Sequence, residues 1–331
     1  MNILGYDVGG TKISAVIGDE SGRIIDYSRK ATIRHLGKER LTEQLISMGD
    51  DLRQRHGIDR FDSIGIIFAG LVDSKNGRVV SSPNLLGLNN YDITKPLEKH
   101  FHTKAYLEND ATGATIAEKI FGGGRNSDNF IYITLSTGIG GGAFVDGHLL
   151  MGHNGMAGEF GHTVIMSNGP TCGCGRKGCL DAIAGGKGIA RRISENITAV
   201  RDSDILSKIP PNLLTAQKAF EAMQKGDMLS RLIIEETIYY LAIGIVNIAC
   251  ILDPEIIIIG GGISNAGNQL FVPLRRAVRE EFKGMYRNVK IIRGLRNGSD
   301  IASISVPIYK RENGYAPFIS SDKKSRGMSV D

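Results

Sequence analysis

Tryptophan is absent from this sequence of 331 residues, only four residues are cysteine, and aromatic side chains make up 6%. So few cysteines exclude a small secreted domain held together by several disulfides. The chain also has only a small excess of positive charge, with a formal net charge of +5. Its basic residues are spread along the chain, except for Lys323, Lys324 and Arg326, which lie close together. A protein that binds nucleic acid usually concentrates its basic residues on one face. The composition therefore disfavours a nucleic-acid partner.

Long hydrophobic runs are lacking too. The longest, residues 241–252, contains Asn247 and is shorter than the roughly 20 residues that cross a bilayer, so it predicts a buried helix. Residues 1–7 predict a buried strand and lack the charged and apolar segments of a secretory signal. We therefore expect a cytoplasmic protein without a membrane partner, and its length favours about two domains.

The cysteines that are present are crowded together. Cys172, Cys174 and Cys179 lie in one glycine-rich stretch, and His162 stands ten positions before the first of them. Three thiolates and one imidazole are the ligand set of a tetrahedral structural zinc, and the glycines allow a short loop to fold back on itself. The alternatives are buried free cysteines or a disulfide. However, Cys172 and Cys174 are too close to pair comfortably, and nothing else suggests an oxidising compartment. We predict a structural Zn²⁺ bound by these four residues.

Two carboxylates flank this cluster. Glu159 precedes His162, and Asp181 follows Cys179. A metal bound here would hold both carboxylates in fixed positions. The cluster is therefore expected to serve as a scaffold for a neighbouring site rather than as a centre of metal chemistry.

Glycine is abundant, with 43 residues, and it marks a repeated unit. An apolar strand at residues 3–6 is followed by Asp7-Val-Gly9-Gly10-Thr11-Lys12 and two more short strands. Residues 130–151 repeat this order around a turn predicted over residues 136–142, Ser136-Thr137-Gly138-Ile-Gly140-Gly141-Gly142. Glycine-rich turns let backbone N–H groups face a phosphate, although one such turn alone also fits a plain hairpin. Two similar α/β lobes that each present such a hairpin imply a nucleotide held in the cleft between them.

A third group of glycines follows a predicted strand at residues 256–259. Gly260, Gly261 and Gly262 lead from this strand toward a helix predicted over residues 268–282. The N-terminus of a helix after a glycine turn is suited to anions. The segment is therefore either another nucleotide contact or a crowded strand-to-helix turn.

Asn109 and Asp110 stand between a predicted strand, residues 105–108, and a predicted helix, residues 111–121. An aspartate at this place most often caps the helix. A carboxylate held rigidly at a strand end can also act as a general base. Asp92 is likewise predicted to cap a helix that ends at about residue 102, and the last helix is expected over residues 300–310.

In their order along the chain, these motifs resemble those of the ROK family of bacterial and archaeal sugar kinases and sugar-responsive repressors. The matching segments are Asp7-Val-Gly-Gly-Thr-Lys12, Asn109-Asp110-Ala, Ser136-Thr-Gly-Ile-Gly-Gly-Gly142, Gly158-Glu-Phe-Gly-His162, Cys172-Gly-Cys174 through Cys179-Leu-Asp181, and Gly260-Gly-Gly262. The resemblance covers residues 1 to about 311. Its most specific part is the spacing of His162 and the three cysteines.

The resemblance implies an α/β protein with an actin-like, hexokinase-type (ribonuclease H-like) fold, in which two lobes close over ATP and a hexose. One lobe would contain residues 1–110, with residues 298–312 returning to it. The other would contain residues 111–297, including the zinc-binding loop. Residues 313–331 are polar and aperiodic, and we expect them to form a mobile tail.

The resemblance also implies a role for individual residues. Asp110 would be the general base for the sugar hydroxyl, and Asp7 would lie near a Mg²⁺ ion, through water. One ring nitrogen of His162 would bind zinc while the other faces the sugar. The residues that would contact the sugar are Gly70, Asn84, Asn109, Asp110, Glu159, His162 and Asp181. Those that would contact ATP and Mg²⁺ are Asp7, Gly9, Gly10, Thr11, Lys12, Thr137, Gly138, Gly261 and Gly262.

Two positions depart from the family pattern. Ser136 stands where glycine is usual, and Asp181 stands where the family usually carries glutamate. The shorter Asp181 leaves open a choice between glucose and a hexosamine such as N-acetylmannosamine or N-acetylglucosamine. A sugar-sensing repressor is the alternative of another class; repressors carry a helix-turn-helix domain ahead of the lobe, whereas here the first hairpin begins at Asp7. Another phosphoryl donor, such as polyphosphate, stays open, and we expect a homodimer or a higher homo-oligomer.

Overall fold

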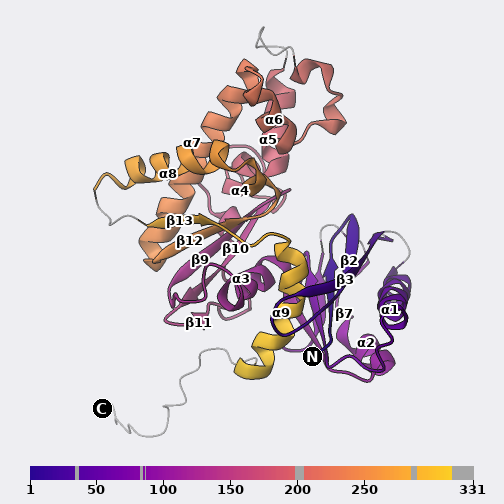
Figure 1. The fold of residues 1–331 in the computed structure, drawn as a ribbon. Coiled ribbons are helices and arrows are strands. Elements are labelled where there is room, and N and C mark those ends of the chain that lie inside the picture. The colour runs from indigo at the N-terminus through magenta and orange to yellow at the C-terminus, as the bar shows by residue number, and fades with distance from the viewer. Residues whose placement is uncertain (34–36, 83–84, 86, 198–204, 285–288, 315–331) are drawn as a thin grey trace, which may run out of the picture.

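The structure, a computed structural model, describes residues 1–33, 37–82, 85, 87–197, 205–284 and 289–314. Two bodies, each built on a five-stranded sheet, lie side by side (Figure 1). Asn84 and the predicted tail beyond residue 314 lie outside the described residues. The mixed α/β character predicted from the sequence is confirmed.

The first sheet has the strand order β3-β2-β1-β4-β8. The bounds of its strands are Ile3–Val8 (β1), Lys12–Gly18 (β2), Ile24–Ala31 (β3), Ser63–Phe68 (β4) and Ala105–Asn109 (β8). The first three form the predicted antiparallel meander, whereas β4 runs parallel to β1 and β8 runs parallel to β4. Because parallel strands end at the same edge of a sheet, the residues that close β1 and β8 lie at one edge.

Helices cover both faces of this sheet (Figure 1). α1 (Gly37–Arg55) and α2 (Thr94–Phe101) pack on one face, and α9 (Gly298–Asn313) packs on the other. Glycines in β1 and β4 allow α9 to approach closely: a Cβ at Gly65 would lie 1.8 Å from the carbonyl oxygen of Ser303. α9 also packs along α3 (Asp110–Ile120), which contacts both sheets. The residues at which one lobe ends and the other begins therefore stay a prediction.

A small sheet extends the first body. Its strands are β5 (Leu71–Asp73), β6 (Arg78–Ser81) and β7 (Tyr91–Asp92). Asp92 lies in β7 and forms ion pairs with Arg78 and Lys95, while α2 begins two residues later without a side-chain cap. The prediction that Asp92 caps this helix was wrong, because its carboxylate is engaged by these two cations.

The second sheet repeats the plan of the first, with the order β11-β10-β9-β12-β13. Its strands are β9 (Phe130–Leu135), β10 (Ile139–Val145), β11 (His148–Leu149), β12 (Ile256–Gly260) and β13 (Lys290–Arg293). β9, β10 and β11 are antiparallel neighbours, and β12 runs parallel to both β9 and β13. The duplication read from the sequence is confirmed by this shared order.

The helices of the second body pack against this sheet. They are α4 (Leu180–Ala184), α5 (Gly186–Asn196), α6 (Ala216–Gln224), α7 (Met228–Leu252) and α8 (Asn268–Phe282), with short 3₁₀ turns at Leu206–Lys208 (η2) and Pro211–Leu213 (η3). The sequence predicted a helix over residues 184–197, which corresponds to α5. The preceding α4 was not predicted, and Gly185 separates it from α5 in an extended conformation (φ −69°, ψ 160°).

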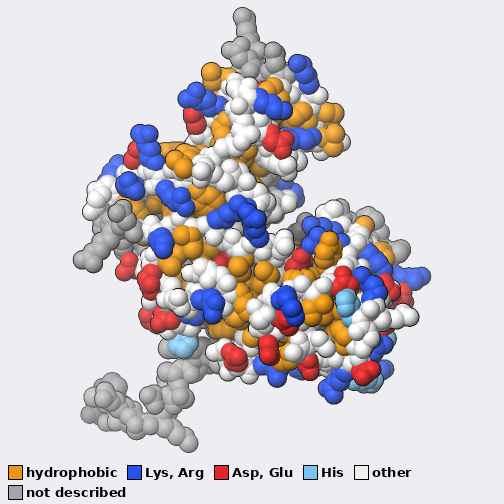
Figure 2. Space-filling view, in the orientation of Figure 1, with side chains coloured by type: hydrophobic (Ala, Val, Ile, Leu, Met, Phe, Trp, Pro, Cys, Tyr) orange, Lys and Arg blue, Asp and Glu red, His pale blue; other side chains and the backbone are white. Residues whose placement is uncertain are grey.

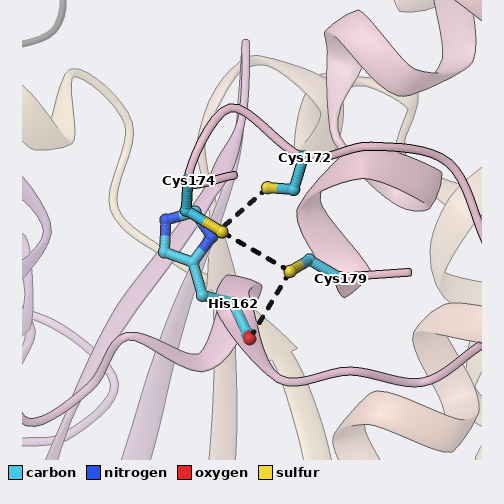
Figure 3. A group of neighbouring side chains, drawn as sticks. All are labelled: His162, Cys172, Cys174 and Cys179. Carbon is cyan, nitrogen blue, oxygen red and sulfur yellow. Dashed lines mark hydrogen bonds between the residues drawn. The ribbon is translucent and has the colours of Figure 1, made fainter. Parts of the chain in front are cut away.

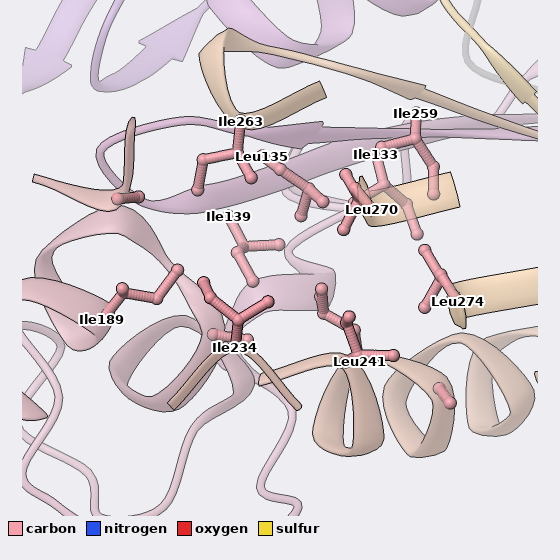
Figure 4. Packing of buried hydrophobic residues seen from close by; sticks show 14 of the residues in the cluster. Ile133, Leu135, Ile139, Ile189, Ile234, Leu241, Ile259, Ile263, Leu270 and Leu274 are labelled. Atoms are coloured by element: carbon pink, nitrogen blue, oxygen red, sulfur yellow. The ribbon is translucent and has the colours of Figure 1, made fainter. Parts of the chain in front are cut away.

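The core of the second body lies between its sheet and these helices (Figure 4). Ile133 and Leu135 of β9 and Ile259 of β12 face Leu241 of α7 and Leu270 of α8 across this core. Among the described residues, α7 alone has the length and hydropathy to cross a membrane, but 56% of its most apolar window is buried within the protein. The buried helix predicted from the sequence therefore forms part of this core.

A buried ion pair joins α9 to β8. The Nζ of Lys310 lies 2.8 Å from a carboxylate oxygen of Glu108, and the two side chains are 4% and 2% exposed. Lys310 also donates to the carbonyl of Leu107, and Ser74 donates to Glu108. Burial lowers the pKa of Lys310, and the charge of Glu108 opposes that shift.

We expect the Lys310→Met variant to lose about 3–5 kcal/mol of stability, because the carboxylate of Glu108 is left buried without its partner. Urea denaturation of the parent, of Lys310→Met and of the double variant with Glu108→Gln measures this; the double variant should recover part of the loss. The matched control is Arg276→Ala, which removes an ion pair whose side chains are 81% and 63% exposed and should change little. Equal losses in the two single variants would contradict the account.

Candidate active site

Asn109 and Asp110 lie where β8 ends and α3 begins. The side-chain oxygen of Asn109 accepts hydrogen bonds from the backbone N–H groups of Ala111 (2.9 Å) and Thr112 (3.2 Å), and its amide donates to the carbonyl of Gly70 (3.1 Å). Asn109 is therefore the cap of α3, and Asp110 is the first helical residue. The capping role that the sequence left open for Asp110 is filled by its neighbour.

The carboxyl group of Asp110 is partly buried and lies close to other carboxylates. Burial, which is the largest cause, and the negative charges of Asp7 and Glu159 together raise the pKa of Asp110 to about 6, against hydrogen bonds from the backbone N–H groups of Ala111 and Asp110 itself. Three carboxylates from separate segments thus face one region. A carboxylate with this pKa is mostly ionised at neutral pH and is a stronger base than an exposed one.

Asp7 is held by the first turn of α9. The hydroxyl of Ser299 donates a hydrogen bond to Asp7, while burial raises the pKa of Asp7. The neighbouring Asp300 is buried and accepts hydrogen bonds from Ser14 (2.8 Å) and Arg29 (2.6 Å). Sequence reasoning missed this support, because the residues that meet here are far apart along the chain.

The first glycine hairpin joins β1 to β2. The N–H of Gly9 donates to the carbonyl of Lys12 (3.1 Å), and the hydroxyl of Thr32 donates to the carbonyl of Gly9 (2.7 Å). Thr11 and Lys12 are exposed, and Gly10 is partly exposed. The base of the hairpin is therefore fixed, while its tip is accessible to a ligand.

The turn of the second hairpin is shorter than the predicted turn over residues 136–142. Its turn is formed by Ser136, Thr137 and Gly138, with the N–H of Ser136 donating to the carbonyl of Gly138 (2.9 Å). Residues 140–142 belong to β10 rather than to the turn. Ser136 and Thr137 are exposed.

The third glycine group lies beside the second hairpin. Gly261 has φ +81°, and a Cβ there would lie 2.3 Å from the carbonyl oxygen of Leu135, the last residue before the turn. Gly262 begins the 3₁₀ turn η4 (Gly262–Ala266), and a Cβ there would meet open space. The predicted contacts Thr137, Gly138, Gly261 and Gly262 are thus neighbours.

The four predicted metal ligands converge (Figure 3). Their ligand atoms all lie within 4.8 Å of one another: the Sγ of Cys172 is 3.5 Å from the Nδ1 of His162, and the Sγ atoms of Cys174 and Cys179 are 3.7 Å apart. Two thiolates bound to one tetrahedral zinc would be about 3.8 Å apart, given Zn–S bonds of about 2.3 Å. All of these thiols are free of disulfides. The donor set and its spacing therefore fit a zinc ion.

His162 is oriented between the cysteines and Glu159. It ends the 3₁₀ turn η1 (Phe160–His162), with Nδ1 toward the thiols and Nε2 3.8 Å from a carboxylate oxygen of Glu159. The side chain of Glu159 is 50% exposed, so it is accessible to a ligand. This orientation is compatible with the predicted sharing of His162 between a metal and a sugar.

Asp181, a predicted sugar contact, is engaged by other groups of the protein. Its Oδ1 accepts a hydrogen bond of 2.6 Å from the N–H of Ile139, directly after the second hairpin, and its Oδ2 lies 3.8 Å from the Sγ of Cys172. The contact of Asp181 with a sugar stays a prediction. Gly70, another predicted contact, packs so closely that a Cβ would lie 2.6 Å from the carbonyl oxygen of Ser81.

The space-filling view shows a hollow between the two bodies (Figure 2). Two duplicated α/β bodies each have a glycine hairpin between their first strands, and a cluster of carboxylates lies where β1 and β8 end. These features define the class: this is the actin-like, hexokinase-type two-lobed fold, as in the ROK hexokinase and glucokinase structures that the chain resembles. The sequence model of the ROK family matches residues 3–299. The chain belongs to the ROK family.

Individual relatives match most of the chain. A glucokinase of Thermotoga maritima is 36% identical over 299 residues, which cover 87% of this chain and 92% of the relative. A glucokinase of Halalkalibacterium halodurans is 35% identical over 277 residues, covering 82% and 84%. The crystal structure of a ROK family glucokinase from Streptomyces griseus in complex with glucose and AMPPNP matches with a TM-score of 0.82 and 28% identity, covering 94% of this chain and all of that one.

Proposed function

We propose that this protein is an ATP-dependent hexose kinase that phosphorylates glucose at O6. The observation that carries the proposal is the carboxyl group of Asp110, whose pKa is raised to about 6 where Asp7 and Glu159 also face. The proposal is supported by the relatives named glucokinase and by the similarity to a glucokinase structure that holds glucose and AMPPNP.

In this proposal Asp110 accepts the proton of the sugar hydroxyl. As that proton leaves, the hydroxyl oxygen forms a bond to the γ-phosphorus, and the bond from this phosphorus to the oxygen of ADP breaks. Phosphoryl transfer is mostly a matter of position and charge stabilisation. Gly9, Gly10, Thr11 and Lys12 on one side would contact the phosphates of ATP, and the turn at residues 136–138 with Gly261 and Gly262 would contact the nucleotide on the other. A Mg²⁺ ion near Asp7 supplies neutralising charge when bound.

The sugar would be held by directional hydrogen bonds. The charge of Glu159 acts on Asp110, and the side chains of Glu159 and its neighbour His162 are partly exposed. Asn109 and Gly70 shape the adjoining wall by their own hydrogen bond, and Asn84 is assigned to the sugar by the family resemblance alone. Zinc bound by His162 and the three cysteines would orient His162 and Glu159 without an open coordination position. We place the protein in the cytoplasm as a homo-oligomer with neither a nucleic-acid nor a membrane partner.

We expect the highest kcat/KM among hexoses for glucose, because a site that hydrogen-bonds each hydroxyl strongly rejects an analogue that lacks one. ADP release from ATP and Mg²⁺ should be measured with glucose, mannose, glucosamine, N-acetylglucosamine and N-acetylmannosamine. The N-acetyl sugars should be at least about tenfold poorer than glucose. A hexosamine kinase is the second candidate, favoured by the shorter Asp181, and would reverse that order. Strong preference for a ketose or a nucleoside would contradict both.

A further inference from the structure

The predicted metal-binding loop, residues 172–179, leads directly into the segment that supports the second hairpin. Cys179 is the residue before α4, and Asp181 lies in the first turn of that helix. α4 ends at Ala184, and after Gly185 the chain continues as α5. The two short helices therefore connect the cysteine cluster to the turn at residues 136–138.

Three hydrogen bonds join this segment to residues 136, 137 and 139 of the hairpin. The N–H of Gly186 donates to the carbonyl of Ser136 (2.9 Å), and the N–H of Lys187 donates to the carbonyl of Thr137 (3.0 Å). The third bond has the opposite sense: the N–H of Ile139 donates to the carboxylate of Asp181 (2.6 Å). The Asp181 bond is the one of the three made by a side chain, so it is the one that a substitution can remove.

Glycines make the contact close. A Cβ at Gly138 would lie 2.6 Å from the Oδ1 of Asp181, and a Cβ at Gly186 would lie 2.6 Å from the carbonyl oxygen of Ser136. A Cβ at Gly185 would lie 3.2 Å from the Cα of Gly138. Because the backbone of the hairpin lies this near to Asp181, we expect a carboxylate one methylene longer at position 181 to shift the N–H of Ile139.

We propose that Asp181 is a positioning residue for the second hairpin, and that the metal-binding loop through Asp181 sets the affinity for the phosphoryl donor. The proposal rests on the proposed function, which assigns this hairpin to the nucleotide. Asp181 holds the N–H of Ile139 so that Thr137 and Gly138 keep one conformation, and the metal holds Asp181 through Cys179. Family resemblance had assigned Asp181 to the sugar instead.

Two kinds of measurement test this on the metal-loaded full chain: hydrogen exchange of the peptide covering residues 136–142, and calorimetric Kd values for AMPPNP with Mg²⁺ and for glucose. The variants are Asp181→Ala and Asp181→Glu, with Asp181→Asn as the mildest change. The matched control is Glu195→Gln, which alters a carboxylate that is 53% exposed on α5. Metal content and circular dichroism identify variants that have lost the loop or the fold.

In the Ala and Glu variants we expect faster exchange in residues 136–142 and an AMPPNP Kd raised about tenfold, as for loss of one hydrogen bond to a charged group. The glucose Kd should stay within about twofold, and Asp181→Asn should lie between these variants and the parent. Chelating the metal should speed exchange in the hairpin of the parent but add little in Asp181→Ala, where the link is already cut.

Unchanged exchange and an unchanged AMPPNP Kd, together with a glucose Kd raised tenfold, would overturn the proposal and make Asp181 a sugar ligand. A sharper preference of Asp181→Glu for glucose over N-acetyl sugars, with no change in AMPPNP affinity, would overturn it as well. If the parent binds neither AMPPNP nor glucose, the proposed function fails; hydrogen exchange still decides whether Asp181 holds the hairpin. If Asp181→Ala does not fold, Asp181→Asn carries the same comparison.

Discussion

The Asp110→Asn variant should bind glucose almost as tightly as the parent while its turnover falls by about 10²–10⁴-fold. Asparagine keeps the size of the side chain and can still accept the hydrogen bond that Asp110 takes from the N–H of Ala111. It cannot accept the proton of the sugar hydroxyl. Steady-state kinetics together with a glucose Kd from calorimetry separate these effects.

The raised pKa of Asp110 adds a pH dependence to this prediction. Below pH about 6 the kcat/KM of the parent should fall about tenfold per pH unit, because protonated Asp110 cannot act as a base. The folded pKa lies above its ordinary value of 3.8, so the contribution of this group to stability is fully present below that value and is lost as the pH rises through about 6. Asp110→Asn should therefore be at least as stable as the parent at pH 8.

The matched control is Asp128→Asn. The carboxylate of Asp128 is 73% exposed and has no role in the proposed site, so the turnover of this variant should stay within about twofold of the parent. Turnover of Asp110→Asn within a few-fold of the parent would show that Asp110 is not the base.

Removal of the metal should abolish glucose binding and lower the melting temperature by at least about 5 °C, given about 2–4 °C for each kcal/mol lost in a domain of roughly 150–250 residues. The reason is that the metal would tie η1, which carries His162, to the loop that carries the three cysteines. Without it Glu159 and His162 lose their common position. Chelation and the Cys179→Ser variant should have the same effect. Thermal melts and glucose calorimetry measure it.

Cys250→Ser is the control for this experiment, because Cys250 is exposed on α7, outside the cluster. Its zinc content, melting temperature and glucose affinity should match those of the parent. Elemental analysis that finds much less than one zinc per chain in the purified parent would contradict the assignment of this cluster.

Much of the fold could be predicted because its signals are local. The helix at Asn268–Phe282 has the predicted bounds, since a helical spacing is visible within one segment. The glycines at 140–142 were misread as a turn. A Cβ at Gly141 would lie 2.6 Å from the ring of Phe160, and one at Gly142 would lie 2.4 Å from the hydroxyl of Thr115. These glycines serve close packing inside β10, and a sequence does not distinguish that use from a turn.

The candidate site could likewise be predicted only where its signals are local. The cysteines and His162 could be recognised because all four lie within 18 residues of one another. The contacts of Asp181 with Ile139 and of Asp7 with Ser299 join residues that are far apart along the chain, so no local pattern reveals them. The capping of α3 by Asn109 rather than Asp110 depended on a shift of one residue in the start of the helix, which a pattern does not fix.

The central claim is that the protein transfers the γ-phosphoryl group of ATP to O6 of glucose. It is tested most directly by incubating the purified protein with ATP, Mg²⁺ and ¹³C-labelled glucose and identifying the product by NMR. We expect one molecule of glucose 6-phosphate for each ADP formed, and no phosphorylation of 6-deoxyglucose under the same conditions. ADP formation that does not depend on glucose, or a phosphate on another sugar oxygen, would contradict the account.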